Sequence, residues 1–495
     1  MHTKPNILFF FTDMQRADTI HALGNPIIKT PNLDRLVKEG TAFTNCYSPS
    51  PVCIPARCCM QYGIYPQKTG LFVNGRMMDD NDKSFAEILN QTGYKTQSIG
   101  KCHFTPDAQA NRGFQNRIIQ EECKNDRKQD DYIAYLEDNN LDYFEPHGAR
   151  GEMYYIPQIS SLSQEHNHPT AWIGDKTIDF VEENNSDKPW MLFSSFIHPH
   201  PPFAPPKPWH KLYRTADMPS PIHAEDDKEL YTYINHLQNR YKYRDNGGQD
   251  INLMRTIKAY YYATISFVDY QIGRVLDSLE ETGQLENTII VFSSDHGEYL
   301  GDYNCFGKRG MQDQSSNIPM IIRYPEKIKQ DNICRTPVSL VDILPTFADV
   351  AGASIDKSQF DGQSLINIQN NDSDRKYVYS QFGDKDEAIY MITSEQWKYI
   401  YSVGDRKELL FDKINDTTEL FNQAKTRTSV KEKIKQDFLK HFKNINYTDA
   451  FDENNGKLDW KQYPLKNMSF LNDPEANLLK QDYEPEGTTL PPAYS

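Results

Sequence analysis

Short apolar runs that end at polar residues are the leading pattern of the N-terminal part of the chain. Residues 6–12, 190–196 and 287–293 each form such a run, with no charged side chain inside it. Because apolar residues follow one another instead of alternating with polar ones, each run is typical of a strand covered on both faces of a parallel sheet. Two more strands are expected at residues 94–99 and 318–323.

Helical patterns fall between these runs. In residues 30–40 a threonine, a first-turn proline, spaced apolar residues and a final glycine follow one another in the order of a helix. Further helices are expected at residues 83–89, 173–183, 253–281 and 338–351, the last of them kinked at Pro345. This alternation predicts an α/β fold, with a large, doubly wound and mostly parallel sheet flanked by helices.

Polar stretches interrupt the alternation. Residues 105–170 and 204–250 are irregular, and we expect them to be insertions over the active face. Residues 366–374 indicate a linker, and the strand-like segments and helix beyond it predict a smaller α+β subdomain. The chain is therefore expected to divide into a catalytic domain, residues 1–375, and a C-terminal subdomain, residues 376–495, with an extended proline-rich tail.

Composition limits the possible partners. The 495 residues are 38% hydrophobic and 25% charged, which fits a globular chain with an ample core. A net charge of -15 argues against nucleic acid as a partner, and an anionic substrate would need a locally basic pocket. The eight cysteines lack the spacing of a zinc module or of a dense disulfide framework, so we expect mostly reduced, buried thiols.

The chain shows no targeting segment. No apolar run approaches the length of a membrane span, so we expect none. The first residues lack the pattern of a signal peptide and lead at once into an apolar strand. The expected location is therefore cytoplasmic, or periplasmic or secreted if an export signal has been removed.

Polar residues with catalytic potential come directly after the predicted strands. In an open parallel sheet the carboxyl ends of the strands meet at one edge, and ligands bind there. A single charged residue after a strand is usually a solvated loop residue, but a whole set is better explained by one polar site. The set comprises Asp13, Lys101, His103, His198, His200, Asp295 and His296.

A cysteine and an arginine open another predicted helix. Residues 50–63 indicate a loop that enters a helix with Pro55 at its first position and Gly63 at its end. Cys53 would lie at the helix N-terminus, where free N–H groups and the helix dipole favour an anion or a thiolate. Arg57, one turn on, offers its guanidinium to an oxyanion. Taken alone, the pair is better explained by a buried structural cysteine and an arginine in a surface salt bridge.

The other candidates suggest metal and anion chemistry. Asp13, Asp295 and His296 can offer two carboxylates and an imidazole to a divalent cation; the oxygens favour a hard cation, while the imidazole admits a softer one. Such a metal would polarise the substrate's oxygens. The remaining groups can balance the charge of a tetrahedral dianion and protonate the leaving oxygen, and they are Lys101, His103, His200 and Lys308.

These motifs resemble the sulfatase family, the formylglycine-dependent arylsulfatase type within the alkaline phosphatase superfamily. Cys53-Ile54-Pro55-Ala56-Arg57 is similar to the family signature. Similar elements stand in the family order from residue 5 to about 350, at residues 11–18, 30–36, 100–103, 199–203, 294–298 and 307–309. The resemblance implies both the fold and the activity of that family.

The resemblance also implies a nucleophile and a metal site. A formylglycine-generating enzyme would oxidise Cys53 to formylglycine, whose hydrate attacks sulfur, and Arg57 would steady that hydrate. The metal, usually calcium, would be held by the modified Cys53 and by Asp13, Asp295 and His296.

The remaining roles follow from the same resemblance. Lys101 and Lys308 would clamp the sulfate, and His200 would donate the proton to the leaving alcohol. His103 would take a proton from the second hydroxyl of the hydrate and so regenerate the aldehyde. For His198 we expect a packing role in its loop.

One position departs from the family. Many sulfatases carry a second aspartate after the first, and here that residue is Met14, whose thioether is a poor calcium ligand. This departure, together with His296, resembles choline-sulfatase-like and phosphonate-monoester-hydrolase-like relatives. Calcium is still the expected metal, with manganese or zinc as alternatives, and Gln15 or a water can fill the vacant position.

Three functions remain in competition. The first is a sulfuric ester hydrolase that acts on a sulfated small molecule, most readily a sulfated saccharide. The second is a phosphonate monoester or phosphodiester hydrolase with the same nucleophile. The third is a noncatalytic anion-binding protein in which Cys53 stays a thiol.

Overall fold

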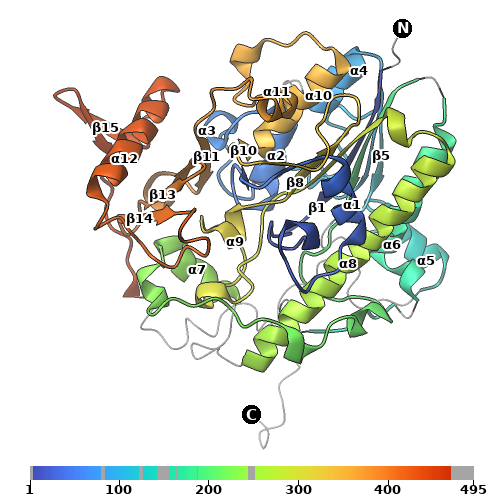
Figure 1. Cartoon of the computed structure of the whole chain (residues 1–495), viewed down its shortest axis with the longest axis horizontal. Coiled ribbons are helices and arrows are strands. Elements are labelled where there is room, and N and C mark those ends of the chain that lie inside the picture. Colours follow the sequence, from blue (N-terminus) through green and yellow to red (C-terminus); the bar gives the residue numbers. More distant parts are fainter. Residues whose placement is uncertain are drawn as a thin grey trace, which may run out of the picture.

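The computed structural model describes residues 4–79, 84–121, 126–141, 155, 157–162, 164–186, 188–242 and 251–469, with the backbone alone over 239–242. Figure 1 shows the arrangement of the helices and strands. The predicted proline-rich tail and Cys123 lie outside the described residues.

An eight-stranded sheet forms the centre of the molecule. Its first five strands are parallel, whereas β8 runs antiparallel to both of its neighbours, which confirms the mostly parallel sheet predicted from the sequence. In spatial order the strands are β5 (Asn116–Ile119), β4 (Lys95–Gly100), β6 (Trp190–Ser195), β1 (Asn6–Thr12), β7 (Thr288–Ser294), β8 (Met320–Arg323), β2 (Thr41–Phe43) and β9 (Asn332–Cys334).

Strand β1 shows why the apolar runs are continuous. It lies between β6 and β7, with Phe9 opposite both Phe193 and Val291, and all of its residues are buried. Phe9 belongs to the core on one face of the sheet and Phe10 to the core on the other. Because both faces are covered, every position of the strand has to be apolar or hydrogen-bonded within the protein.

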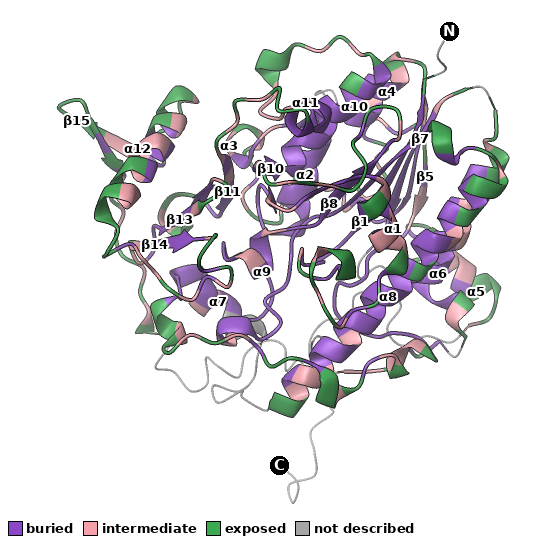
Figure 2. Cartoon of the chain, viewed as in Figure 1, coloured by how far each residue is buried: buried purple, intermediate pink, exposed green. Residues whose placement is uncertain are grey.

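Helices cover both faces, as in a doubly wound fold (Figure 1). The central strands between them, β6, β1, β7 and β8, are buried along their length (Figure 2). The core on one face includes α2 (Cys53–Tyr62), α4 (Phe85–Gln91) and α10 (Ile343–Ala351). The core on the other face includes α1 (Pro31–Glu39), α5 (Asp131–Asp138), α6 (Pro169–Glu183) and α8 (Ile251–Glu281).

The C-terminal part is a smaller α+β unit, as predicted. An antiparallel sheet is followed by a helix and a hairpin, and Trp460 of the hairpin stacks on Tyr401 of the sheet with ring centroids 4.3 Å apart. The elements are β11 (Val378–Phe382), β12 (Ile389–Thr393), β13 (Trp397–Ser402), β14 (Lys407–Asp412), α12 (Thr428–Asn444), β15 (Phe451–Asn454) and β16 (Lys457–Trp460).

Three local expectations differ from the structure. Residues 116–119, expected in an insertion, are the edge strand β5 of the main sheet. Residues 338–342 are not part of the α-helix, because β10 (Val338–Ser339) pairs with β3 (Cys46–Tyr47), residues 340–342 form a 3-10 turn and α10 begins only at Ile343. Pro345 therefore lies in the first helical turn, where it does not break a hydrogen bond, and no kink is needed.

Short helices occupy other stretches that had been predicted to be irregular. The expected linker at 366–374 begins as α11 (Leu365–Gln369), and residues 204–250 contain α7 (Tyr233–Lys242). Two single-turn helices, α3 (Pro66–Thr69) and α9 (Asp313–Ser316), connect larger elements. Such short elements carry too few residues for a periodic pattern to show in the sequence.

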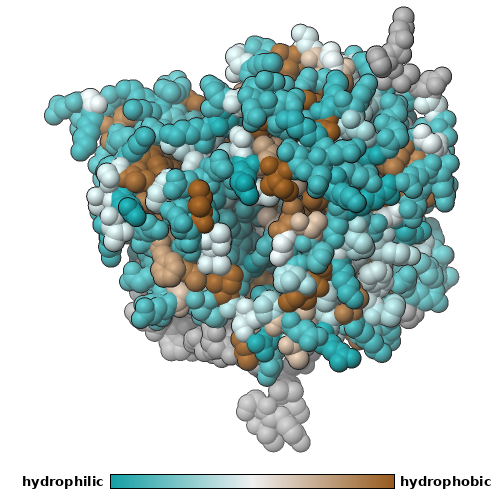
Figure 3. All heavy atoms as spheres, in the orientation of Figure 1, coloured by the Kyte–Doolittle hydropathy of each residue, from teal (hydrophilic) through white to brown (hydrophobic). Residues whose placement is uncertain are grey.

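The thiols and the surface agree with the composition. All seven cysteines within the described residues are free, and six of them are buried. Among the helices that are described, none combines the length and the apolar character needed to cross a membrane. The face seen in Figure 3 is mostly hydrophilic, with scattered apolar groups.

Candidate active site

Helix α2 begins at the cysteine that the sequence singled out. The helix starts at Cys53, two residues earlier than predicted, so Pro55 is its third residue and not its first. This register suits the helix start, since Pro55 has no N–H and the N–H of Ile54 donates to Asn74 Oδ1 at 3.1 Å. Gly63 ends the helix in the left-handed conformation at φ 66°, as expected.

The ends of two central strands bring three potential metal ligands to Cys53. Asp13 follows β1, and Asp295 and His296 follow β7. Potential ligand atoms of these residues and of Cys53 all lie within 4.8 Å of one another, and all four side chains are buried. Cys53 Sγ is 3.3 Å from His296 Nε2 and 3.8 Å from Asp13 Oδ1.

The orientation of His296 and Asp295 suits a cation. His296 Nδ1 lies 3.0 Å from the carbonyl oxygen of Gly297, so a proton on Nδ1 leaves Nε2 to face the cluster. Burial and the neighbouring Asp13 raise the pKa of Asp295 to about 6, because two buried carboxylates repel each other. Carboxylate oxygens with one imidazole therefore fit a divalent ion, which would relieve this repulsion.

Arg57 holds both carboxylates in place. Its guanidinium donates to Asp13 Oδ2 at 3.2 Å and to Asp295 Oδ2 at 3.0 Å. It also donates to the Lys101 carbonyl at 2.6 Å and to Ser195 Oγ at 3.1 Å. These four hydrogen bonds use the Nε–H, both Nη1–H groups and one Nη2–H, so Arg57 orders the metal-ligand group around Cys53.

Two lysines give the site its positive charge. Lys308 Nζ donates to Cys53 Sγ at 2.8 Å, and Lys101 Nζ lies 2.7 Å from Asp13 Oδ2. Burial opposes charge on Asp13, but Lys101 and the other nearby cations hold the pKa of this carboxyl well below its usual value. Burial and Asp13 likewise act against a Cys53 thiolate, yet Lys308, Lys101 and His296 hold the pKa of the thiol well below its usual value.

His200 joins this group from the loop after β6. Its Nε2 lies 3.5 Å from Lys308 Nζ, and its Nδ1 lies 2.8 Å from the carbonyl oxygen of Pro201. His198 points elsewhere: its Nδ1 lies 3.0 Å from Thr170 Oγ1, and its ring packs on His168 with centroids 4.8 Å apart. The contacts of His198 are those of loop packing, while His200 reaches the charged cluster.

His103 follows the end of β4 by three residues. Among the described residues, no group lies within hydrogen-bond distance of its ring, and its Nδ1 is buried without a partner. Its backbone is left-handed, with φ 59°, and its N–H donates to both carboxylate oxygens of Glu121 at 2.9 and 3.1 Å. The N–H of Cys102 donates to the same carboxylate at 3.0 Å, so Glu121 holds the turn that carries Lys101 and His103.

Met14 and Gln15 occupy the positions directly after the potential ligand Asp13. Met14 is fully buried and left-handed, with φ 71°, and its backbone N–H donates to Asp295 Oδ1 at 3.0 Å. The Gln15 side chain donates to Thr19 Oγ1 at 3.2 Å. Its amide oxygen Oε1 is buried without a hydrogen-bond partner among the described residues, so Gln15 remains a candidate for the vacant position beside the four potential ligands.

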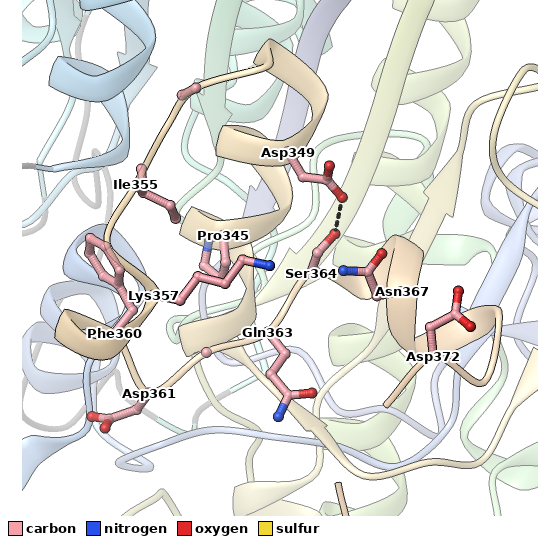
Figure 4. A pocket seen from close by; sticks show the side chains of 12 residues that line it. Pro345, Asp349, Ile355, Lys357, Phe360, Asp361, Gln363, Ser364, Asn367 and Asp372 are labelled. Carbon is pink, nitrogen blue, oxygen red and sulfur yellow. Dashed lines mark hydrogen bonds between the residues drawn. The ribbon is translucent and has the colours of Figure 1, made fainter. Parts of the chain in front are cut away.

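A polar pocket of about 470 Å3 lies elsewhere, between α10 and α11 (Figure 4). Asp361, which lines this pocket, donates its N–H to the carbonyl of Gly63. Gly63 ends α2 and Cys53 begins it, so the pocket and the cysteine lie at opposite ends of that helix. The carboxylate of Asp361 already accepts from the Tyr65 N–H, and that of Asp349 accepts from Ser364. This pocket is thus separate from the cluster around Cys53.

Several residues that order the site were missed at the sequence level. Glu121 comes from a polar stretch without periodicity, and Asn74 and Ser195 are single polar residues in a loop and at a strand end. Each acts through a partner far along the chain, as in the pairs Glu121–His103, Asn74–Ile54 and Ser195–Arg57. Only Ser195 carried a usable signal, because it ends a buried strand next to other site residues.

Comparisons with known protein families match nearly the whole chain. A family model described as Sulfatase matches residues 5–353, and one described as N-sulphoglucosamine sulphohydrolase, C-terminal, matches residues 301–448. An arylsulfatase of Clostridium perfringens is 30% identical, over 85% of this chain and 90% of its own length. An N-acetylglucosamine-6-O-sulfatase of Bacteroides thetaiotaomicron is 27% identical, over 85% of this chain and 82% of its own.

Solved structures share the fold. The phosphonate monoester hydrolase of Agrobacterium radiobacter superposes with a TM-score of 0.76 at 22% identity, covering 93% of this chain and 100% of that chain. A protein solved in complex with its substrate D-glucosamine-2-N,6-O-disulfate superposes with a TM-score of 0.70 at 24% identity, covering 90% of this chain and 99% of that chain. At these identities the likenesses show that the fold is shared with both structures.

Proposed function

This chain belongs to the sulfatase family, and on that premise we propose that it hydrolyses sulfate monoesters of saccharides with a formylglycine made from Cys53. Its activity class, sulfate ester hydrolysis, follows from the family and from its named relatives. The observation that carries the proposal is the position of Cys53 Sγ. It lies at a helix N-terminus, 2.8 Å from Lys308 Nζ and inside the group of potential metal ligands.

The maturation step rests on the Cys53 segment. We assign the oxidation of its side chain to a formylglycine-generating enzyme, as the signature resembles that of the family. A divalent metal held by Asp13, Asp295, His296 and the modified residue 53 would polarise the sulfate and lower the pKa of the attacking hydroxyl. The carboxylate oxygens make calcium the first candidate, and His296 admits manganese or zinc.

The lysines would bind the sulfate group. Lys308 reaches the Cys53 side chain and Lys101 reaches Asp13, so both ammonium groups border the position where a sulfate would meet the nucleophile. Ammonium groups fixed in a buried site stabilise the charge that develops on the sulfate oxygens without reorganising. The net charge of -15 therefore does not prevent an anionic substrate from binding here.

His200 is the proposed acid for the leaving alcohol. Its Nδ1 is held by the Pro201 carbonyl, which leaves Nε2 on the side of Lys308, where the ester oxygen would lie. His103 is the proposed base for the second hydroxyl of the hydrated side chain. The Nδ1 of His103 is buried and has no hydrogen-bond partner among the described residues, which leaves it available to accept the proton of that hydroxyl.

Replacing His200 by alanine is expected to affect esters of poor leaving groups most. A saccharide alcohol needs protonation as it leaves, so we expect a loss on the order of 10²- to 10⁴-fold in kcat/KM for a glucosamine 6-sulfate. A 4-nitrophenolate leaves without a proton, so the same variant should lose less than about tenfold on 4-nitrophenyl sulfate. The variant His198→Ala is the matched control and should lower both rates alike. Equal losses on both substrates in His200→Ala would contradict the assigned role.

The sulfated-saccharide class is supported by relatives. The 27% identical relative is named an N-acetylglucosamine-6-O-sulfatase, and the chain covers most of its length. Met14, in place of a second carboxylate, favours one other candidate, a phosphonate monoester hydrolase with the same nucleophile.

Turnover of two matched aryl esters separates the candidates. Matured protein is assayed with 4-nitrophenyl sulfate and with the 4-nitrophenyl monoester of phenylphosphonate. We expect kcat/KM for the sulfate to exceed that for the phosphonate by about tenfold or more, equal to about 1.4 kcal/mol in the transition state. A preference for the phosphonate would overturn the proposal in favour of the second candidate.

A further inference from the structure

The loop that carries Lys308, together with the helix that follows it, is hydrogen-bonded to the segments that carry Cys53 and His296. We define the Lys308 loop as residues 305–312, which leads directly into α9. The N–H of Arg309 donates to the carbonyl of Pro51, just before Cys53, at 2.9 Å. In α9, Ser315 accepts from the N–H of Gly297, which follows His296, and Ser316 accepts from the N–H of Ser48, both at 2.8 Å. The position of this loop and of α9 is therefore coupled to the nucleophile and to the metal ligands.

A lysine of the C-terminal sheet reaches the same loop. Lys398 lies on β13, and its side chain is completely buried. Its Nζ donates to the carbonyl of Met311 at 3.1 Å and makes a short ion pair with Asp313, the first residue of α9. It lies 2.6 Å from Glu419, whose other carboxylate oxygen accepts from the Asp313 N–H at 2.8 Å. Lys398 and Glu419 thus hold the point where the Lys308 loop becomes α9.

The charges around Lys398 keep this contact ionic. Burial opposes its charge, but Asp313 and Glu419 raise the pKa of Lys398 above its usual value. Tyr47 donates to Asp313 at 3.0 Å, and the Lys398 Nζ lies over the Tyr47 ring, 5.0 Å from its centroid. Lys413 also faces the Tyr47 ring, but burial lowers its pKa to about 8. A buried ammonium with these partners has one low-energy position, which suits a fixed support.

We infer that Lys398 is a positioning residue through which the C-terminal sheet holds Lys308 against the nucleophile. Lys398 does not contact Cys53; its effect passes through Met311 and Asp313 to the Lys308 loop. This inference rests on the proposed sulfate-binding role of Lys308. It explains why the C-terminal sheet is part of the catalytic unit although it contributes none of the proposed catalytic or metal-binding residues.

The test uses a variant that removes the ammonium but keeps the volume. In Lys398→Met, the Met311 carbonyl loses its donor and Asp313 and Glu419 lose their cation, so the loop shifts. A displacement of about 1 Å at a catalytic group costs on the order of 10- to 100-fold in kcat/KM, and that is the expected loss on 4-nitrophenyl sulfate. The control is Lys431→Met, the same change in the same subdomain, which breaks the 2.7 Å contact with Glu408 and should stay within about twofold of the parent.

A double-mutant cycle shows whether the effect passes through Lys308. In a Lys308→Ala background the loop has lost the group that it positions, so Lys398→Met should change kcat/KM by less than about threefold. A loss in that background as large as in the parent would overturn the inference. So would a Lys398→Met variant that keeps full activity.

Hydrogen exchange tests the same inference without relying on turnover. Amide exchange in a peptide over residues 305–316 should be faster by about tenfold or more in Lys398→Met and unchanged in Lys431→Met. Unchanged exchange of that peptide in Lys398→Met would overturn the inference, even if no sulfate ester were hydrolysed by the parent. If Lys398→Met does not fold, Glu419→Gln, which keeps the ion pair with Asp313, is held to the same criteria, with exchange about threefold faster or more.

Discussion

Replacing Cys53 by alanine is expected to abolish sulfate ester hydrolysis, with a loss of kcat/KM on the order of 10⁴-fold or more. The reason is that Cys53 supplies the proposed nucleophile, and no other described side chain in the cluster could take its place. Lys308, Lys101 and the metal ligands would still bind sulfate, so the residual rate reports binding and electrostatics alone. The measurement is the initial rate on 4-nitrophenyl sulfate with protein co-produced with a formylglycine-generating enzyme.

The parent protein in the same experiment has to show the modification. Its tryptic peptide across residue 53 should be lighter than the unmodified thiol form by about 18 Da, the change from –CH₂SH to –CHO. The control is Cys58→Ala, which removes another buried thiol from the same helix and should keep the activity within a few-fold. An unmodified thiol in the parent, or full activity in Cys53→Ala, would refute the nucleophile and favour an anion-binding protein.

Replacing Asp13 by asparagine is expected to remove the metal and most of the activity. The carboxylate is a potential ligand in the cluster and the partner of Lys101 at 2.7 Å and of Arg57 at 3.2 Å. A neutral amide binds a divalent cation less well, and loss of the metal's polarising effect costs several kcal/mol, on the order of 10³-fold in rate. Metal content by elemental analysis should fall from about one ion per chain to a small fraction. Added calcium, which should raise the Tm of the parent, should leave that of the variant nearly unchanged.

The control for this variant is another buried, ion-paired aspartate. Asp302 pairs with Arg16 at 2.8 Å and is fully buried, but it belongs to no metal-ligand group in the described structure. Asp302→Asn should lower the Tm and keep the metal content of the parent. Full metal occupancy in Asp13→Asn would exclude Asp13 as a ligand.

The sequence by itself determined the architecture and the centre of the site. Continuous apolar runs such as residues 6–12 identify buried parallel strands, because a strand covered on both faces has to be apolar or hydrogen-bonded within the protein at every position. The residues that follow such runs meet at one sheet edge for topological reasons, which is why Asp13 and Asp295 come together although they are far apart in the chain. The Cys53 helix start was also readable, since its proline and glycine act locally, although its first residue was misplaced by two.

The tertiary structure alone decided how these groups are held. Strand β5 and the Glu121 carboxylate that binds the His103 N–H lie in stretches without a distinctive pattern. Lys398 lies in a strand-like segment, but that pattern does not show that its ammonium reaches the Lys308 loop. The tertiary structure also showed that Arg57 orders the two carboxylates, and that the amide nitrogen of Gln15 donates to Thr19 while its amide oxygen is left without a partner among the described residues. The physical reason is that periodicity records which face of an element is buried, whereas a single hydrogen bond or ion pair between distant residues leaves no periodic trace. Only packing in three dimensions determines which donor meets which acceptor.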